Sequence, residues 1–219
     1  EKYLDQFFRQ MTPDTGMDNA NNDQSINNTV VAQAVAAVID KAYTLTGKNS
    51  ILVTHSQGGR AGWDTVLYTN HIAAIVAIEP GSGPATEGDV YNTLLEKRIP
   101  VSFYYGDFIG TTYSNIPAAQ MWNNMRSSAY NFEQRYNAEE RNCSVFDLPV
   151  EGIYGNDHMM FQDLNNDKIA DHIEKWIADG FPRSDIDRTT DSNDNSNSNA
   201  NLKSFKIYGI LFYMLLLLF

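Results

Sequence analysis

The chain of 219 residues carries a formal net charge of −11 and is 42% hydrophobic, which fits about one domain with enough apolar side chains for a sizeable core. The acidic balance argues against nucleic-acid binding, because phosphate contacts need clustered lysine and arginine and the sequence has no such cluster. The single cysteine, Cys143, excludes an intrachain disulfide and a zinc-type ligand cluster, and we expect it to pack in the core.

The predicted elements alternate between helices and strands, which is typical of an α/β fold with a mostly parallel sheet and helices on both faces. They were identified from apolar periodicity and from Gly, Pro, Asn and Asp at the breaks. In chain order we first predict a loop to residue 24, a helix at 30–42, a strand from Ile51 and a helix at 61–68. A strand at 72–78, a helix at 90–97 with Asp89 as N-cap and a strand at 99–105 follow. The last predicted elements are a helix at 118–127, a short strand at 144–148 and a helix at 166–178.

The C-terminal part of the sequence has a different composition. From Asp185 to Asn201 it is dominated by Asp, Ser and Asn and cannot bury enough surface to fold. The apolar run 207–219 is shorter than the roughly 20 residues that a helix needs to cross a bilayer. Small residues, a polar spacer and a terminal apolar tail together match a glycosylphosphatidylinositol (GPI) attachment signal, and a short tail anchor is the alternative. We therefore expect a folded domain at 1–182, a disordered linker at 183–206, a tail at 207–219 and a location at the cell surface.

The stretch 51–61 carries the most specific motif. A β-branched run predicts a buried strand, two consecutive glycines predict a sharp turn, and the following pattern predicts a helix. Ser56 lies at the turn, as in a nucleophile elbow, where strain exposes the serine hydroxyl and the next backbone N–H, that of Gln57, faces the reacting oxygen. Thr54 stands where the usual G-x-S-x-G pattern has glycine. We predict Ser56 as a nucleophile and Gln57 as an oxyanion-hole donor, against the alternative of an ordinary strand-to-helix turn.

A serine nucleophile needs a base, which is normally a histidine, and the chain has four. His55 directly precedes Ser56, so on an extended strand its side chain points to the opposite side. His71 lies in a loop between a helix and a strand, and His172 lies on the inner stripe of the last helix, so a structural role is expected for both. His158 follows the last strand and precedes the last helix, which is the chain order of elbow-type hydrolases. We predict His158 as the base.

Two carboxylates at the ends of strands could hold the base. Glu79 ends the strand after the elbow, and Asp107 ends the next strand. Both lie at the edge where parallel sheets place their sites, and both satisfy the order serine, acid, histidine. Spacing alone favours Asp107, and a loop or capping carboxylate is the alternative for each.

Four blocks of the sequence resemble one α/β-hydrolase family, the secreted bacterial esterases whose triad acid is a glutamate after the sixth strand. The resemblance extends from about residue 6 to residue 177 and is carried by 55–57, 76–81, 105–107 and 155–166. It implies Ser56 as nucleophile, Glu79 as acid and His158 as base. Glu79 therefore becomes the first choice, and Asp107 is the fallback.

The resemblance implies a carboxylic ester hydrolase that acts on a small-molecule ester through an acyl-enzyme, with no metal and no organic cofactor. The alternative is a catalytically inactive hydrolase-fold module used for binding or adhesion at the cell surface. A hydrolase fold has several strands before its elbow, whereas only about fifty residues precede Ser56. We therefore expect the C-terminal part of a longer hydrolase domain, which by itself is a poor catalyst.

Aromatic and methionine side chains near these motifs are candidates for an acyl or leaving-group pocket. Packing in the core is the alternative for each of them. They are Tyr104, Tyr105, Met121, Trp122, Met159 and Met160.

Overall fold

A computed structural model describes residues 24–109 and 115–183. The described strands form one parallel sheet in the order β1-β2-β3-β4, so each strand pairs with the next one along the chain. The strands are β1 (Ser50–Ser56), β2 (Ile72–Pro80), β3 (Val101–Tyr105) and β4 (Cys143–Asp147). The helices are α2 (Gln24–Thr46), α3 (Gly58–Asp64), α4 (Gly88–Lys97), α5 (Pro117–Ala138) and α6 (Asn166–Ala178), with short 3-10 helices η1 (Thr65–Leu67) and η3 (Met160–Gln162). The predicted α/β class with a parallel sheet is confirmed.

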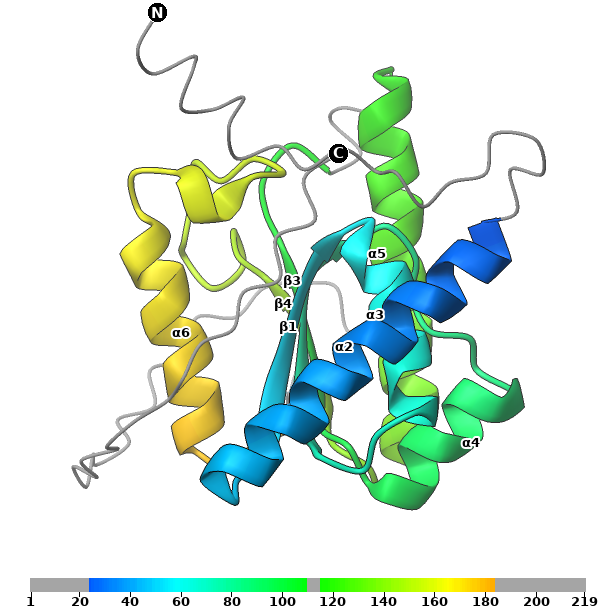
Figure 1. Cartoon of the computed structure of the whole chain (residues 1–219). Coiled ribbons are helices and arrows are strands. Elements are labelled where there is room, and N and C mark those ends of the chain that lie inside the picture. Colours follow the sequence, from blue (N-terminus) through cyan, green and yellow to red (C-terminus); the bar gives the residue numbers. More distant parts are fainter. Residues whose placement is uncertain (1–23, 110–114, 184–219) are drawn as a thin grey trace, which may run out of the picture.

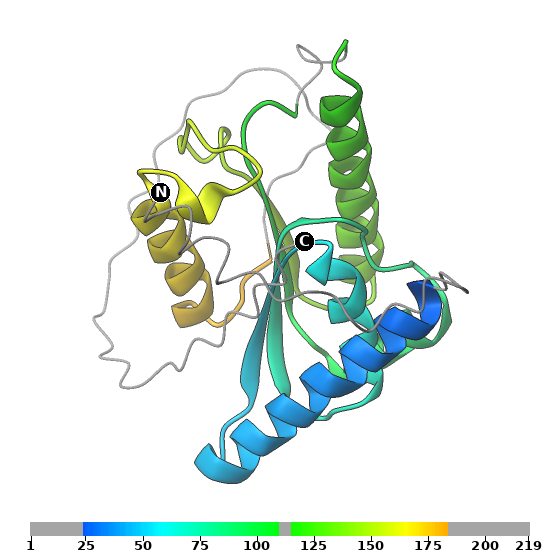
Figure 2. The same ribbon diagram turned by 45° about the horizontal axis from the view of Figure 1, so that its top comes forward.

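Helices cover both faces of the sheet. Figures 1 and 2 show α2, α3 and α5 on one face and α6 on the other. The larger core cluster joins the first face to α2, α3, α4 and α5 and contains Trp63, Phe103 and Phe132. The smaller cluster joins the second face to α6 through Ile173 and Trp176.

Strand β2 lies inside the sheet, between β1 and β3. Its apolar residues contribute to both clusters: Ile75 and Ala77 belong to the larger cluster, and Val76 and Ile78 belong to the smaller one. A strand buried on both faces has no solvent side, which explains the uninterrupted apolar run in the sequence. The prediction of a central parallel strand here is confirmed.

The helix bounds agree with the sequence patterns at some ends and differ at others. Helix α6 has the predicted bounds, whereas α5 runs for 22 residues instead of stopping at residue 127. The second half of α5 is mostly polar, so its sequence gives no clear apolar pattern. Its buried residues Phe132 and Tyr136 nevertheless hold that half against the sheet. The predicted N-cap Asp89 is wrong. The N-cap of α4 is Glu87, and Asp89 lies in the first turn, where a carboxylate favours the positive end of the helix dipole.

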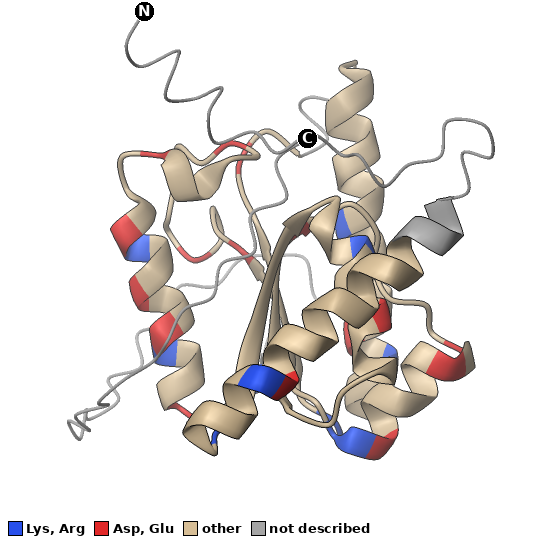
Figure 3. Ribbon diagram, viewed as in Figure 1, with Lys and Arg blue, Asp and Glu red and all other residues tan. Residues whose placement is uncertain are grey.

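Charged residues are unevenly spread over the helices (Figure 3). Helix α2 carries only Asp40 and Lys41, whereas α6 alternates acidic and basic residues. Among the described residues, no helix combines the length and apolarity that a bilayer span would need. The predicted linker and apolar tail, from residue 184 on, lie outside the described residues.

Candidate active site

The turn after β1 has the backbone expected of a strained elbow. Ser56 is the last residue of β1, has a φ of 51° and is followed by α3 after one residue. Positive φ is uncommon for a residue with a Cβ and marks local strain. The Gly81 N–H donates to the Ser56 carbonyl at 2.6 Å, so the neighbouring strand end holds this conformation in place.

Two glycines of α3 allow the helix to pack closely behind the elbow. A Cβ on Gly59 would lie 2.5 Å from the Cβ of Pro80, and a Cβ on Gly62 would lie 2.6 Å from the Cγ2 of Thr54. Thr54 stands where the usual motif has glycine. Because Gly62 has no side chain, the methyl group of Thr54 has room between β1 and α3. A Cβ on Gly58 would meet nothing within 4 Å, so this glycine is not needed for space.

Three side chains from separate segments form a continuous hydrogen-bonded row. His158 Nε2 lies 2.9 Å from Ser56 Oγ, and His158 Nδ1 lies 2.6 Å from Glu79 Oε2. A carboxylate can only accept, so Nδ1 carries a hydrogen and Nε2 accepts the serine hydroxyl hydrogen when the ring is neutral. The structure thus brings together the serine, histidine and glutamate that the sequence analysis named.

Glu79 is held in the interior at the end of β2. Its side chain is 2% exposed, and its Oε1 accepts the Gly106 N–H at 2.8 Å. Gly106 has no room for a side chain, because a Cβ there would lie 2.6 Å from the Asn156 carbonyl oxygen and 3.3 Å from Glu79 Oε1. The backbone at the end of β3 therefore lies directly against the carboxylate, and the Gly106 N–H fixes the orientation of the carboxylate.

Asp107, the fallback acid, has a different partner. Its Oδ2 accepts the Asn156 N–H at 2.8 Å, and its own N–H donates to the Asn156 carbonyl at 2.8 Å. These two bonds join the end of β3 to the loop that carries His158. Among the described contacts the imidazole pairs with Glu79 and not with Asp107.

The loop before His158 is held by a second set of polar contacts. Asn156 is fully buried, and its amide nitrogen donates to Asn165 Oδ1 at 2.8 Å. Asn165 in turn donates to the Tyr154 carbonyl at 3.0 Å, and the Asp157 N–H donates to Asp163 Oδ2 at 3.1 Å. The resemblance covered these residues as a block, and the structure gives them a physical role, which is to hold the loop that carries His158.

Two rings lie beside His158, and the sequence analysis predicted a contact with His158 for neither of them. The His55 ring centroid lies 4.5 Å from that of His158, and His55 Nε2 lies 2.7 Å from the His158 carbonyl oxygen. The Trp122 ring centroid lies 4.2 Å from that of His158. Strand alternation placed His55 away from Ser56, but the positive φ of Ser56 breaks that alternation. No local pattern connects Trp122, on α5, to a loop after β4.

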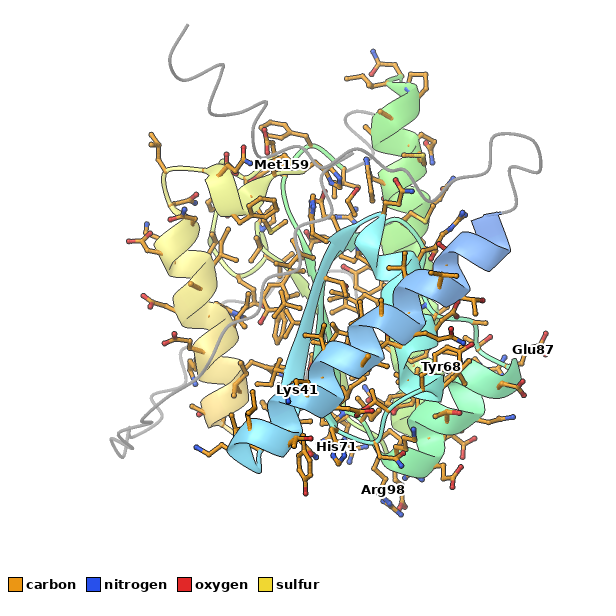
Figure 4. All side chains as sticks on the ribbon, in the orientation of Figure 1. Lys41, Tyr68, His71, Glu87, Arg98 and Met159 are labelled. Atoms are coloured by element: carbon orange, nitrogen blue, oxygen red, sulfur yellow. The ribbon has the colours of Figure 1, made fainter. Side chains whose placement is uncertain are left out.

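The other two histidines lie elsewhere. His71 stacks on Tyr43 with a centroid distance of 3.6 Å, at the end of the molecule opposite to Met159, the neighbour of His158 (Figure 4). His172, on α6, lies with its Nδ1 3.3 Å from the Tyr104 hydroxyl. Both have the structural surroundings expected from the sequence.

The pocket candidates fall into two groups. Tyr104, Tyr105 and Met160 are fully buried, so the suggestion that they line a pocket is wrong and the alternative of core packing holds. Burial raises the pKa of both phenols well above the usual value, which keeps them neutral. Met121 is exposed, Met159 is half-buried, and the Trp122 ring contacts the His158 ring.

The described part of the chain contains no group of three or more His, Cys, Asp or Glu side chains arranged to hold a metal ion. No protein family model matches the sequence, and no curated protein matches it. The interpretation of the site therefore depends on its own geometry.

Proposed function

We propose that the chain is a serine hydrolase of the α/β-hydrolase type, which cleaves small carboxylic esters through an acyl-enzyme. The observation that supports this best is the row Ser56, His158 and Glu79, with bonds of 2.9 and 2.6 Å and a buried acid. A hydroxyl bonded to an imidazole that is itself bonded to a carboxylate is the arrangement that activates serine.

The first half of the reaction forms the acyl-enzyme. Ser56 Oγ attacks the ester carbonyl carbon while its proton moves to His158 Nε2. Glu79 stabilises the resulting imidazolium through Nδ1–H. We expect the N–H of Gln57, the N-cap of α3, to donate to the developing oxyanion. The bond to the leaving alcohol then breaks, and the alcohol takes the proton from Nε2.

The second half restores the enzyme. Water loses a proton to His158 Nε2 and attacks the acyl carbon. The bond to Ser56 Oγ then breaks, Nε2 returns the proton to Oγ, and the carboxylic acid leaves. No redox step occurs, and the residues named here balance every proton.

The hydrolase type of the fold is supported by chain order. The serine and the glutamate lie at the ends of β1 and β2, and the histidine follows β4. The three side chains meet at the carboxyl ends of the parallel strands, where α/β sheets place their sites. The sequence resemblance described above points in the same direction.

Fluorophosphonate labelling with peptide mapping tests the proposal. The expected result is one labelled site at Ser56, with Ser56→Ala unlabelled, inactive on p-nitrophenyl acetate and as stable to heat as the wild type. If the folded full-length natural protein takes no label, this would contradict the enzyme assignment and favour the inactive binding module. Retained esterase activity in Ser56→Ala would contradict the assignment of Ser56 as the nucleophile.

A further inference from the structure

The imidazole of His158 is contacted on more than its two nitrogens. The His158 side chain is 32% exposed. The hydrogen bonds to Ser56 and Glu79 by themselves would leave one part of the ring facing solvent and free to rotate about its side-chain bonds. Trp122 and His55 supply the remaining contacts, from α5 and from β1. Because these elements are far apart in the sequence, the loop that carries His158 is fixed against two rigid parts of the fold.

The Trp122 ring packs against the imidazole in a tilted arrangement. The two rings have centroids 4.2 Å apart and planes tilted by 35°. An indole face is electron-rich, so it attracts a ring that becomes positively charged, and the attraction is larger for the imidazolium than for the neutral ring. Trp122 is itself partly buried against the larger core cluster, which limits its own motion.

His55 holds the backbone of the base. Its Nε2–H donates to the His158 carbonyl at 2.7 Å, and its ring packs edge-on to Phe161, with centroids 4.8 Å apart. Burial lowers the pKa of His55, which keeps this neighbour neutral when the base takes up a proton. A second positive ring at this distance would oppose that protonation.

We propose that Trp122 and His55 are positioning residues for the base: Trp122 stacks on the His158 imidazolium formed during acylation, and His55 fixes the loop backbone that presents the ring. This proposal depends on the proposed hydrolase function. It adds two residues that act through His158 and not on the substrate.

Diisopropyl fluorophosphate tests Trp122 in a single chemical step. Ser56 Oγ forms a bond to phosphorus, fluoride leaves, and the serine proton moves to His158 Nε2. We expect Trp122→Leu to lower the maximal inactivation rate about fivefold, with the concentration for half-maximal rate unchanged, since an aromatic face contributes modestly to a partly exposed cation. Trp122→Phe, which keeps an aromatic face, should stay close to the wild type. An equal rate in all three proteins, or a change only in the half-maximal concentration, would overturn the role.

His55 is tested in the same assay with a matched pair of variants. His55→Leu removes the donor to the His158 carbonyl and should lower the maximal rate between about ten- and a hundredfold, because small displacements of catalytic groups are costly. His55→Gln keeps an N–H donor and should recover most of that loss. If His55→Leu is as fast as the wild type, or if His55→Gln is no better than a folded His55→Leu, the backbone role is wrong.

Tryptophan fluorescence tests the ring contact without any turnover. A protonated imidazole in contact with an indole quenches its emission, so wild-type emission should be lower at acidic pH than at neutral pH. Glu79 and His55 are the ionisable side chains in contact with the ring. Two variants, Trp122→Phe and His158→Gln, are therefore needed to assign the pH-dependent component of the emission to the pair Trp122 and His158. Both variants should lose it. An unchanged component in Trp122→Phe overturns the stacking even if Ser56 is labelled. Quenching without any labelling overturns the hydrolase function instead, and with it the positioning role.

Discussion

Glu79 uses its two carboxylate oxygens for different partners. Oε2 binds the Nδ1 of His158, and Oε1 accepts the Gly106 N–H. The first contact orients the base, and the second orients the acid. A buried carboxylate with both oxygens engaged has a single orientation, which is what a triad acid requires.

Glu79→Gln should lower kcat for p-nitrophenyl acetate by on the order of a thousandfold or more. If the amide oxygen keeps the Gly106 N–H, the amide NH₂ faces His158 and donates to Nδ1. The ring must then carry its hydrogen on Nε2, where it can no longer accept the proton of Ser56. Steady-state kinetics measures the loss, and circular dichroism checks that the variant is folded.

Asp107→Asn separates the two acid candidates. Asparagine can still accept the Asn156 N–H, so we expect kcat within about threefold of the wild type if Asp107 only supports the loop. The same assay compares it with Glu79→Gln. A larger loss in Asp107→Asn than in Glu79→Gln would reverse the assignment of the acid.

His55 should make stability depend on pH. Burial lowers its pKa below the ordinary value of 6.5, and this outweighs the hydrogen bond to the His158 carbonyl. Below that value the unfolded chain binds a proton that the folded chain does not, so the free energy of unfolding falls as the pH falls. His55→Gln should therefore lose less stability than the wild type between about pH 7.5 and pH 5. Urea unfolding across this range measures it, and identical losses would contradict the shift.

The residues of the site were predictable to the extent that local pattern defines them. The elbow identified Ser56, and chain order identified His158. Both Glu79 and Asp107 end parallel strands, local spacing favoured Asp107, and only the resemblance favoured Glu79. Trp122 was suggested only for a pocket, since its contact with the base depends on the length and direction of α5.

At the scale of elements, α3 and β2 are joined through one tight contact. Gly59 lies against Pro80, one residue after Glu79, and Gly81 bonds back to Ser56. The helix behind the serine and the strand end that carries the acid therefore move as a unit. Any side chain on Gly59 would push these two elements apart.

Gly59→Ala should destabilise the protein by roughly 1–3 kcal/mol, since its Cβ would lie 2.5 Å from Pro80 Cβ and the clash involves a rigid ring. Gly58→Ala is the matched control. Its Cβ has open space, and alanine favours a helix over glycine, so we expect no loss or a gain of up to about 1 kcal/mol. Chemical denaturation of both variants measures the difference, and equal stabilities would argue against the close packing.

The elements themselves were predictable where burial leaves a clear signal. The apolar run of β2 and the amphipathic stripe of α6 gave bounds close to the observed ones. The second half of α5 was missed because its apolar residues are sparse among polar ones, and only tertiary packing shows which face is buried. The cap of α4 was misassigned because neighbouring acidic residues, Glu87 and Asp89, are equivalent in a sequence pattern.

At the scale of the whole molecule, the C-terminal composition leads to a prediction about attachment. We expect the mature natural protein to end before Lys203 and to carry a glycolipid, because the linker is polar and the terminal run is short and apolar. Mass spectrometry of the C-terminal peptide, with release by phosphatidylinositol-specific phospholipase C, measures this. A peptide that contains Phe219 would exclude the lipid anchor.

The strand order has a consequence for biosynthesis. Each strand of the sheet pairs with the one made just before it, and His158 comes after all four. A ribosome releases the chain from its N-terminus, so the serine and the acid emerge while the base is not yet made. On the proposed mechanism the nascent protein is then inert toward the esters of the cell that produces it. On this mechanism, ester hydrolysis can begin only after translation has passed the last described strand and His158 has been made. The order of the residues in the chain therefore prevents hydrolysis during synthesis.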